Sequence, residues 1–527
     1  MSSHVPDTVF ERRLSSLVNS GQPEVLQGGR KGLEKESLRV TPEGKLAQTP
    51  HPRALGSALT NEHITTDYSE ALIELVTPTF LTSWELLQYL LDLHQFVYRH
   101  LGSELLWATS MPGAISGDKE IPIAEYGGSH IGRMKSVYRR GLGLRYGRMM
   151  QAISGVHFNY SFPLPFWDAY ADLIGARDRG PGFVSERYFD LLRNYRRHGW
   201  LVLYLFGVSP VVCKSFFQGR EHSLPELDAN TAYEPYATTL RMSDIGYRNR
   251  SQSELAVSVN SLEEYVRDLT GAITTPHPPY AALGLRDPDG GYRQLNTNIL
   301  QIENEYYSYI RPKRVARSGE RPTKALRRAG VEYVEVRALD VSAFDPVGVN
   351  QNKLRFLEAF LALCLLKESP PIAESEQRSL DRNHLLVARR GREPGLTLRR
   401  DGRDVPMRGW ARELIDSLAG ICEILDRGDP GRPYSLALAD QAGKVEDVRL
   451  TPSARVMSEL GATGESFFEL ALRMSKTHKA YMLELYPPNE ERQRELALEA
   501  AQSLERQRAI EASSEGTFEE FLARYFA

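Results

Sequence analysis

Acidic residues lie inside apolar runs at several places in this 527-residue chain, and such runs restrict how it can fold. Glu74 lies within Leu-Ile-Glu-Leu-Val at residues 72–76, and Asp67 comes shortly before this run. A buried carboxylate is costly unless it is paired or binds a metal ion. Glu74 is therefore a candidate ligand, although it could also be exposed on a half-buried element. Asp67 taken alone is better explained as an exposed residue.

A second apolar segment, residues 154–162, alternates strictly between two faces and predicts a strand over 157–162. Its polar face carries His157, Asn159 and Ser161. A polar face on so apolar a strand suggests the lining of a cavity. A single histidine is more often structural, but a neutral imidazole binds manganese or zinc and, less often, magnesium.

Glu34 and Glu36 are two positions apart in a predicted strand over residues 32–40. Residues at this spacing share one face of a strand. Two adjacent carboxylates can bind a divalent cation, which prefers clustered oxygen ligands. The alternative is a solvent-exposed edge strand, with Lys35 and Arg39 on the opposite face.

Glu335 and Arg337 have the same spacing in a predicted strand over residues 331–339 and share their face with Tyr333. The two charges could simply neutralise each other along the strand. Alternatively, Glu335 binds a metal ion and the planar guanidinium of Arg337 binds phosphate oxygens.

Polar residues also alternate between residues 296 and 307, which predicts a further strand whose polar face includes Glu305 and Tyr307. A basic cluster follows at Arg311, Lys313 and Arg314. These cations could bind a triphosphate, or they could form a solvated turn.

The sequence lacks the phosphate-binding P-loop, the dinucleotide fingerprint, H-E-x-x-H and G-x-S-x-G. Acidic residues and one histidine spread over several strands suit metal-assisted phosphoryl chemistry. Their spacing alone does not separate this chemistry from that of a two-carboxylate hydrolase.

Composition excludes other classes of protein. The formal charge of -3 argues against a nucleic-acid-binding protein, which is usually basic. The longest apolar stretches, 200–213 and 356–366, are too short to span a membrane and predict core elements. Three widely spaced cysteines and the lack of a signal peptide predict a reduced, cytoplasmic protein. No obligate protein partner is evident, which is compatible with a monomer.

Helices and scattered strands together predict the α+β class. Thr82 and Glu85 have the spacing of a capping box ahead of an apolar helix, and Thr517 and Glu520 repeat it near the end of the chain. Residues 352–366 and 490–511 are also expected to be helical, whereas 389–403 is expected to be a loop or hairpin.

Eight segments, in order between about residues 28 and 400, resemble the bacterial glutamate–cysteine ligases, also called γ-glutamylcysteine synthetases. They are G-L-E-K-E-S-L-R-V, H-P-R-A-L-G-S-A-L-T, I-T-T-D-Y-S-E-A-L-I-E-L-V-T-P, Q-A-I-S-G-V-H-F-N-Y-S, R-M-S-D-I-G-Y, L-Q-I-E-N-E-Y-Y, I-R-P-K-R and E-Y-V-E-V-R-A-L-D. The resemblance implies a glutamine-synthetase-like fold, in which a curved antiparallel sheet forms an active-site funnel with helices packed outside. Residues 1–527 would form one catalytic unit, with its core at 28–400 and a mostly helical C-terminal region at 401–527.

The resemblance also assigns roles to individual residues. The metal ligands would be Glu34, Glu36, Asp67, Glu74, His157 and Glu335. Arg337 would face the transferred phosphoryl group, and Glu335 and Arg337 would be the catalytic residues. Lys313, Arg314 and Arg337 would bind the nucleotide. Tyr68, Tyr138, Gln151, Arg241, Tyr247 and Tyr307 would line the amino-acid pockets, and Tyr68 stands where relatives carry Phe.

The implied activity uses ATP and magnesium, or manganese, to join the γ-carboxylate of L-glutamate to the amine of L-cysteine through γ-glutamyl phosphate. This reaction is the first step of glutathione biosynthesis. Two alternatives remain: a related ligase that accepts another amine, and a non-catalytic protein with a degenerate site.

Overall fold

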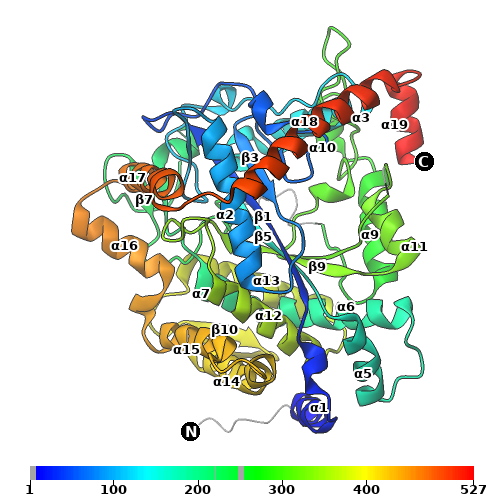
Figure 1. Ribbon diagram of the computed structural model, residues 1–527, viewed down its shortest axis with the longest axis vertical. Helices are drawn as coiled ribbons and strands as arrows, with labels where there is room; N and C mark the ends of the chain where they lie inside the picture. Colours follow the sequence, from blue (N-terminus) through cyan, green and yellow to red (C-terminus); the bar gives the residue numbers. More distant parts are fainter. Residues whose placement is uncertain (1–7, 220, 247–254, 318) are drawn as a thin grey trace.

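A seven-stranded antiparallel sheet forms the centre of the computed structural model, which describes residues 8–219, 221–246, 255–317 and 319–527 (Figure 1). The strand order is β2-β3-β1-β5-β9-β8, and β4 pairs with the end of β1. The strands are β1 (Arg30–Val40), β2 (Ile64–Thr66), β3 (Leu72–Val76), β4 (Leu105–Leu106), β5 (Gly155–Ser161), β8 (Ile310–Lys313) and β9 (Tyr333–Asp340). Two short hairpin-like pairs lie outside this sheet, β6 (Val211–Cys213) with β7 (Thr231–Tyr233) and β10 (Thr397–Arg400) with β11 (Arg403–Pro406).

Helices surround the sheet and fill most of the remaining chain. They are α1 (Thr8–Asn19), α2 (Ser83–His100), α3 (His130–Tyr146), α4 (Arg148–Gln151), α5 (Leu164–Ile174), α6 (Pro181–His198), α7 (Trp200–Phe206), α9 (Leu262–Thr274), α10 (Pro278–Ala282), α11 (Pro322–Ala329), α12 (Gln351–Leu366), α13 (Glu374–Arg390), α14 (Met407–Leu425), α15 (Pro433–Glu446), α16 (Pro452–Thr463), α17 (Phe467–Ala480), α18 (Glu490–Ala512) and α19 (Phe518–Phe526). Helices α2, α6 and α7 contact the sheet directly, and α12 packs between α2 and α6.

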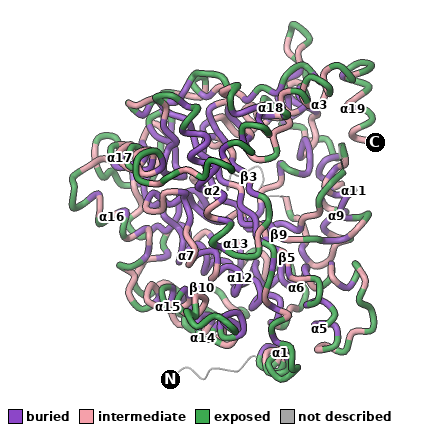
Figure 2. Tube along the Cα trace, viewed as in Figure 1, coloured by how far each residue is buried: buried purple, intermediate pink, exposed green. Residues whose placement is uncertain are grey.

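The two faces of the sheet differ in chemistry because side chains alternate along each strand. Leu33, Ile73, Phe158 and Val336 are fully buried on the face that the helices cover. Figure 2 shows this buried backbone around β5, β9 and α12. The other face carries the charged residues, and strand pairing aligns them. Across strands, Glu36 lies opposite Glu74, Glu34 opposite His157, and Glu335 opposite both Asn159 and Arg311.

Most of the predicted elements are confirmed. Thr82 caps α2 by accepting a hydrogen bond from the Glu85 amide, and Thr517 and Glu520 form a reciprocal capping box on α19. The apolar stretches 200–213 and 356–366 are core elements, and the expected hairpin in the Arg-rich segment is the β10–β11 pair.

Two expectations were wrong. Residues 296–307 form no strand but a loop with a single 3₁₀ turn at Glu303–Glu305. The exposed-edge interpretation of Glu34 and Glu36 also fails, because β1 lies between β3 and β5 in the sheet.

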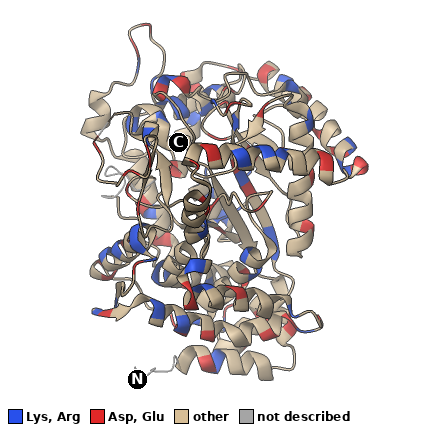
Figure 3. Cartoon of the chain, turned by 90° about the vertical axis from the view of Figure 1, so that its left-hand side faces the viewer, with Lys and Arg blue, Asp and Glu red and all other residues tan. Residues whose placement is uncertain are grey.

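The region after residue 401 is mostly helical and packs against the preceding chain. The Ser57 amide, for example, donates a hydrogen bond to Ser503 Oγ in α18 (2.9 Å). Acidic and basic residues are interspersed over the side of the chain shown in Figure 3. None of the helices in the described ranges is long and apolar enough to cross a membrane.

Candidate active site

A cavity of about 510 Å³ lies against the charged face of the sheet. Strands β1, β3, β5, β8 and β9 supply one wall, and α3 supplies another. Residues from chain segments more than 300 positions apart, such as Glu34 and Glu335, therefore line one hollow.

One part of the cavity lining is an acidic cluster. A carboxylate oxygen of Glu34 lies 3.1 Å from His157 Nδ1, and one of Glu36 lies 3.7 Å from His157 Nε2. One ligand atom each from Glu34, Glu74 and His157 can be chosen so that all three lie within 4.8 Å of one another. Asp67 lines the same cavity. Four carboxylates and one imidazole thus converge, and a hard divalent cation prefers such oxygen ligands.

Two carboxyls of the acidic cluster have raised pKa values, whereas at Glu34 the hydrogen bond with His157 and nearby positive charge outweigh burial and lower the pKa. Burial and the nearby Asp67 carboxylate raise the pKa of Glu36 to about 8. Burial and the charges of Glu34, Asp67 and Glu36 raise the pKa of Glu74 well above its usual range. Burial and Arg337 lower the pKa of His157, which favours the neutral ring that can ligate a metal. A bound cation would relieve the repulsion among these carboxylates.

A basic cluster adjoins the acidic one, with Arg337 Nη1 3.4 Å from His157 Nδ1. Glu335 lies 3.2 Å from Lys313 Nζ, 3.2 Å from Arg337 Nη1 and 3.9 Å from Arg311 Nη1. Burial would raise the pKa of Glu335, but Lys313 and Arg337 outweigh it and hold this pKa well below its usual range. Three cations thus surround one carboxylate, leaving positive charge for an anionic ligand such as phosphate.

Helix α3 forms one wall of the cavity, and Tyr138 was the single residue of this helix that the sequence analysis assigned to the site. Lys135, Arg139, Leu142 and Tyr146 line the cavity from the same helix. Burial and the Arg139 charge lower the pKa of Lys135 to about 8. These positions follow the helical period of three to four residues, so the pattern around Tyr138 contained the signal for them.

Buried polar contacts fix the 294–307 loop, which carries Tyr307, against α3. Arg145 forms a fully buried ion pair with Glu305 (3.0 Å) and donates to the Asn296 carbonyl (2.8 Å). Gln301 Nε2 donates to the Tyr138 carbonyl (3.1 Å). The polar alternation that suggested a strand therefore reflects contacts with α3.

Twelve of the sequence-predicted residues line this cavity. They are Glu34, Glu36, Asp67, Tyr68, Glu74, Tyr138, Gln151, His157, Tyr307, Lys313, Glu335 and Arg337.

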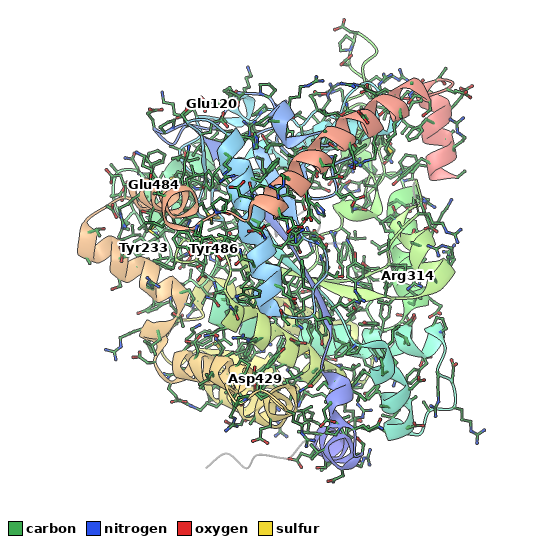
Figure 4. All side chains as sticks on the ribbon, in the orientation of Figure 1. Glu120, Tyr233, Arg314, Asp429, Glu484 and Tyr486 are labelled. Atoms are coloured by element: carbon green, nitrogen blue, oxygen red, sulfur yellow. The ribbon has the colours of Figure 1, made fainter. Side chains whose placement is uncertain are left out.

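Two other predicted residues do not line the cavity. Arg241 is buried beside its wall, where its guanidinium donates to the Arg337 carbonyl (3.2 Å). Arg314, labelled in Figure 4, lies 3.5 Å from Glu332. The predicted Tyr247 falls outside the described residues.

Comparison with known proteins gives the same family as the sequence motifs. The family model for glutamate–cysteine ligase matches residues 14–387. The chain is 48% identical over 521 residues to a glutamate–cysteine ligase of Alcanivorax borkumensis, covering 98% of this chain and 99% of the relative. A relative in Azotobacter vinelandii is 49% identical over 523 residues, covering 98% of each chain. The chain belongs to the glutamate–cysteine ligase family.

A solved structure extends this likeness to the fold. The crystal structure of the glutamate–cysteine ligase of Francisella tularensis in complex with AMP has a TM-score of 0.89 and 36% identity. The match covers 95% of this chain and 98% of that one. The ligase family is thus recognisable over nearly the whole chain, including the region after residue 400 where the sequence motifs thin out.

Strand alternation could have refined the prediction for the basic cluster of this ligase. Arg311 and Lys313 are two apart on β8 and line the cavity, whereas Arg314 follows the end of the strand. Applied to residues 310–314, the same two-residue rule that paired Glu34 with Glu36 selects Arg311 and Lys313.

Proposed function

We propose that this ligase joins the γ-carboxylate of L-glutamate to the amine of L-cysteine with ATP, through γ-glutamyl phosphate, as the first step of glutathione biosynthesis. One observation carries the proposal: in a member of this family, an acidic cluster and a basic cluster face the same cavity. A carboxylate is a poor electrophile, and transfer of a phosphoryl group from ATP makes it reactive.

The acidic cluster is the proposed magnesium site. Its ligands would be Glu34, Glu36, Asp67, Glu74 and His157, and Glu335 would be a further ligand facing the nucleotide. The raised pKa values of Glu36 and Glu74 support this assignment, because a bound cation would favour the ionised form of these crowded carboxyls. The imidazole also suits manganese. Divalent cations bound there would screen the repulsion between the ATP phosphates and the glutamate carboxylate.

The basic cluster is the proposed phosphate site. Arg337, Lys313 and Arg311 can donate hydrogen bonds to the γ-phosphoryl oxygens as the phosphoryl group moves. The glutamate γ-carboxylate attacks the γ-phosphorus and releases ADP. The cysteine amine then attacks the acyl carbon, releases phosphate and loses a proton.

The amino-acid pockets are assigned to residues around the rest of the cavity. Tyr68, Tyr138, Gln151 and Tyr307 line it and can shape it around two small substrates. The family resemblance also assigns Arg241 and Tyr247 to these amino-acid pockets. Because Arg241 does not line the cavity, it would act through a neighbouring residue of the cavity wall. Arg314 remains a predicted nucleotide contact, but its pairing with Glu332 favours Arg311 in this role.

Several broader features belong to the same proposal. A seven-stranded antiparallel sheet with helices on one face and the cavity on the other supports a glutamine-synthetase-like funnel. Tyr525 of α19 lines the cavity, which supports a single catalytic unit over 1–527. Three buried, unpaired cysteines support a cytoplasmic location. The AMP complex of the Francisella relative supports use of an adenine nucleotide.

Phosphate release tests the proposal directly. Release should require ATP, magnesium, L-glutamate and L-cysteine together, and mass spectrometry should identify γ-glutamylcysteine. Turnover with another amine but not with cysteine would support the alternative ligase, and no ATP turnover would support a degenerate site. Glu74→Gln should abolish release, whereas the exposed Glu43→Gln in the turn after β1 serves as a matched control.

A further inference from the structure

A second cavity, of about 270 Å³, lies between α1 and α14 at the end of the molecule opposite α3 and α18 (Figure 1). We call it the α1–α14 cavity. None of the residues that the structure describes lines both this cavity and the active-site cavity. The residues that matter here are Phe10 and Leu14 of α1, His198 of α6, Lys367 after α12, Arg400 of β10 and Trp410 of α14.

Two buried side chains in this cavity carry ring nitrogens without hydrogen-bond partners among the described residues. They are His198 Nδ1 and Trp410 Nε1. Their residues are 7% and 4% exposed, and their rings pack edge to face with centroids 5.9 Å apart. An indole N–H can only donate, and leaving it unsatisfied in the interior costs free energy. The indole therefore favours an occupant that accepts a hydrogen bond, and the neutral imidazole can donate a second one in its Nδ1–H tautomer.

Positive charge surrounds the same buried end. Burial and the charges of Lys367, Arg400 and Arg197 lower the pKa of His198 well below its usual range. The Arg400 guanidinium lies 5.1 Å from the Trp410 ring centre, and Lys367 Nζ lies 5.5 Å from that of Phe10. Glu413 balances part of this charge by accepting from Arg400 (2.5 Å). The other acidic residues of the lining, Glu11 and Asp416, are exposed and so belong to the outer rim.

Part of the cavity wall is apolar and is formed by Phe10, Leu14, Trp410 and Leu414, two of which are aromatic. The volume is close to the lower end of the range for small-molecule sites. We propose that the α1–α14 cavity binds a small aromatic carboxylate. Its carboxylate accepts hydrogen bonds at the buried, cationic end, and its ring packs between the aromatic walls.

Fluorine NMR of the full-length protein with 4-fluorobenzoate tests this proposal. Saturating L-glutamate is kept present so that the active-site cavity does not contribute. We expect saturable binding with a Kd of about 1 mM, the affinity usual for a ligand of this size. The uncharged 4-fluorobenzamide should bind at least about tenfold more weakly, because it cannot replace the charge-assisted hydrogen bonds.

Two variants locate the site. Trp410→Phe keeps the aromatic wall but removes the N–H, and Lys367→Met keeps the length of the side chain but removes its charge. Each should weaken binding about tenfold, while phosphate release from ATP, glutamate and cysteine is retained. Lys476→Met, at an exposed position of α17, is the matched control and should bind like the wild type.

Three results would overturn the proposal. They are no saturation well above 1 mM, equal binding of the uncharged benzamide, and unchanged affinity in the Lys367→Met protein. The last result stands even where Trp410→Phe fails to fold. Binding that is detected only in a parallel titration without glutamate would assign the signal to the active-site cavity and would also overturn the proposal.

Discussion

Two buried clusters on opposite faces of β1 carry charge in opposite arrangements. On the helix-covered face, Lys31 forms an ion pair with Glu358 (3.1 Å) and donates to the carbonyls of Gly29 and Leu81. Tyr434 donates to Glu358 (2.6 Å). This Lys31–Glu358 cluster balances its own charge. On the cavity face, burial and neighbouring carboxylates instead raise the pKa values of Glu36 and Glu74.

This difference separates charges that support the fold from charges that serve a ligand. Breaking a balanced buried pair leaves an uncompensated charge, so both members are needed for stability. A cluster of like charges destabilises the protein by itself and is retained where function requires it. The comparison therefore predicts opposite effects on stability for substitutions on the two faces.

Glu358→Gln should give the largest effect, because it leaves Lys31 buried without its carboxylate. We expect the free energy of unfolding to fall by about 3–5 kcal/mol, while turnover per folded molecule is retained. Chemical denaturation and active-site titration measure the two quantities. Tyr434→Phe, which removes one hydrogen bond, should cost only about 1 kcal/mol. Equal stability of Glu358→Gln and wild type would show that the Lys31–Glu358 cluster does not stabilise the fold.

Arg337→Ala should act on turnover rather than on folding. Loss of one positioned donor to the phosphoryl group should lower kcat by ~10²–10³-fold. Arg403→Ala, at an exposed position of β11, is a matched control with an unchanged rate. A near-normal rate in Arg337→Ala would remove its proposed role.

His478→Gln tests whether the protein tolerates an extra positive charge in α17, near the buried Lys35 of β1. Burial and the nearby Lys35 lower the pKa of His478 to about 4 in the folded protein, against about 6.5 when unfolded. Between these values the unfolded chain binds more protons, so stability is present above pH 6.5 and falls as pH drops toward 4. The contribution of this group is up to about 3 kcal/mol, and unfolding free energies across that range should decline less steeply in the variant. Parallel curves for the two proteins would contradict this role.

Local patterns in the sequence were sufficient for most of the sheet and for much of the site. Strand alternation placed Glu34 with Glu36 and Glu335 with Arg337 on shared faces, and strand pairing then brought these faces together. Pairing between distant strands is a tertiary property, so the convergence itself came only from the family resemblance.

The errors have the same origin. Residues 296–307 alternate like a strand, but Glu305 and its neighbours are satisfied by Arg145 and the backbone of α3, which local sequence does not reveal. The wall formed by Lys135 and Arg139 was missed because a helical stripe of charged residues is usually solvated. Tertiary partners decide both cases.

Glu74→Gln gives the smallest expected change in stability and the sharpest test of the comparison. In the presence of a chelator it should raise the free energy of unfolding by about 1 kcal/mol, because the variant no longer has to protonate a carboxyl whose pKa the folded protein raises. Added magnesium should stabilise the wild type but not the variant, since a ligand that binds only the folded state shifts the unfolding equilibrium. Glu43→Gln should match the wild type in both conditions. If Glu74→Gln were instead destabilised without metal, the acidic cluster would be balanced like the Lys31–Glu358 cluster. Repulsion among its carboxylates could then not indicate a cation site.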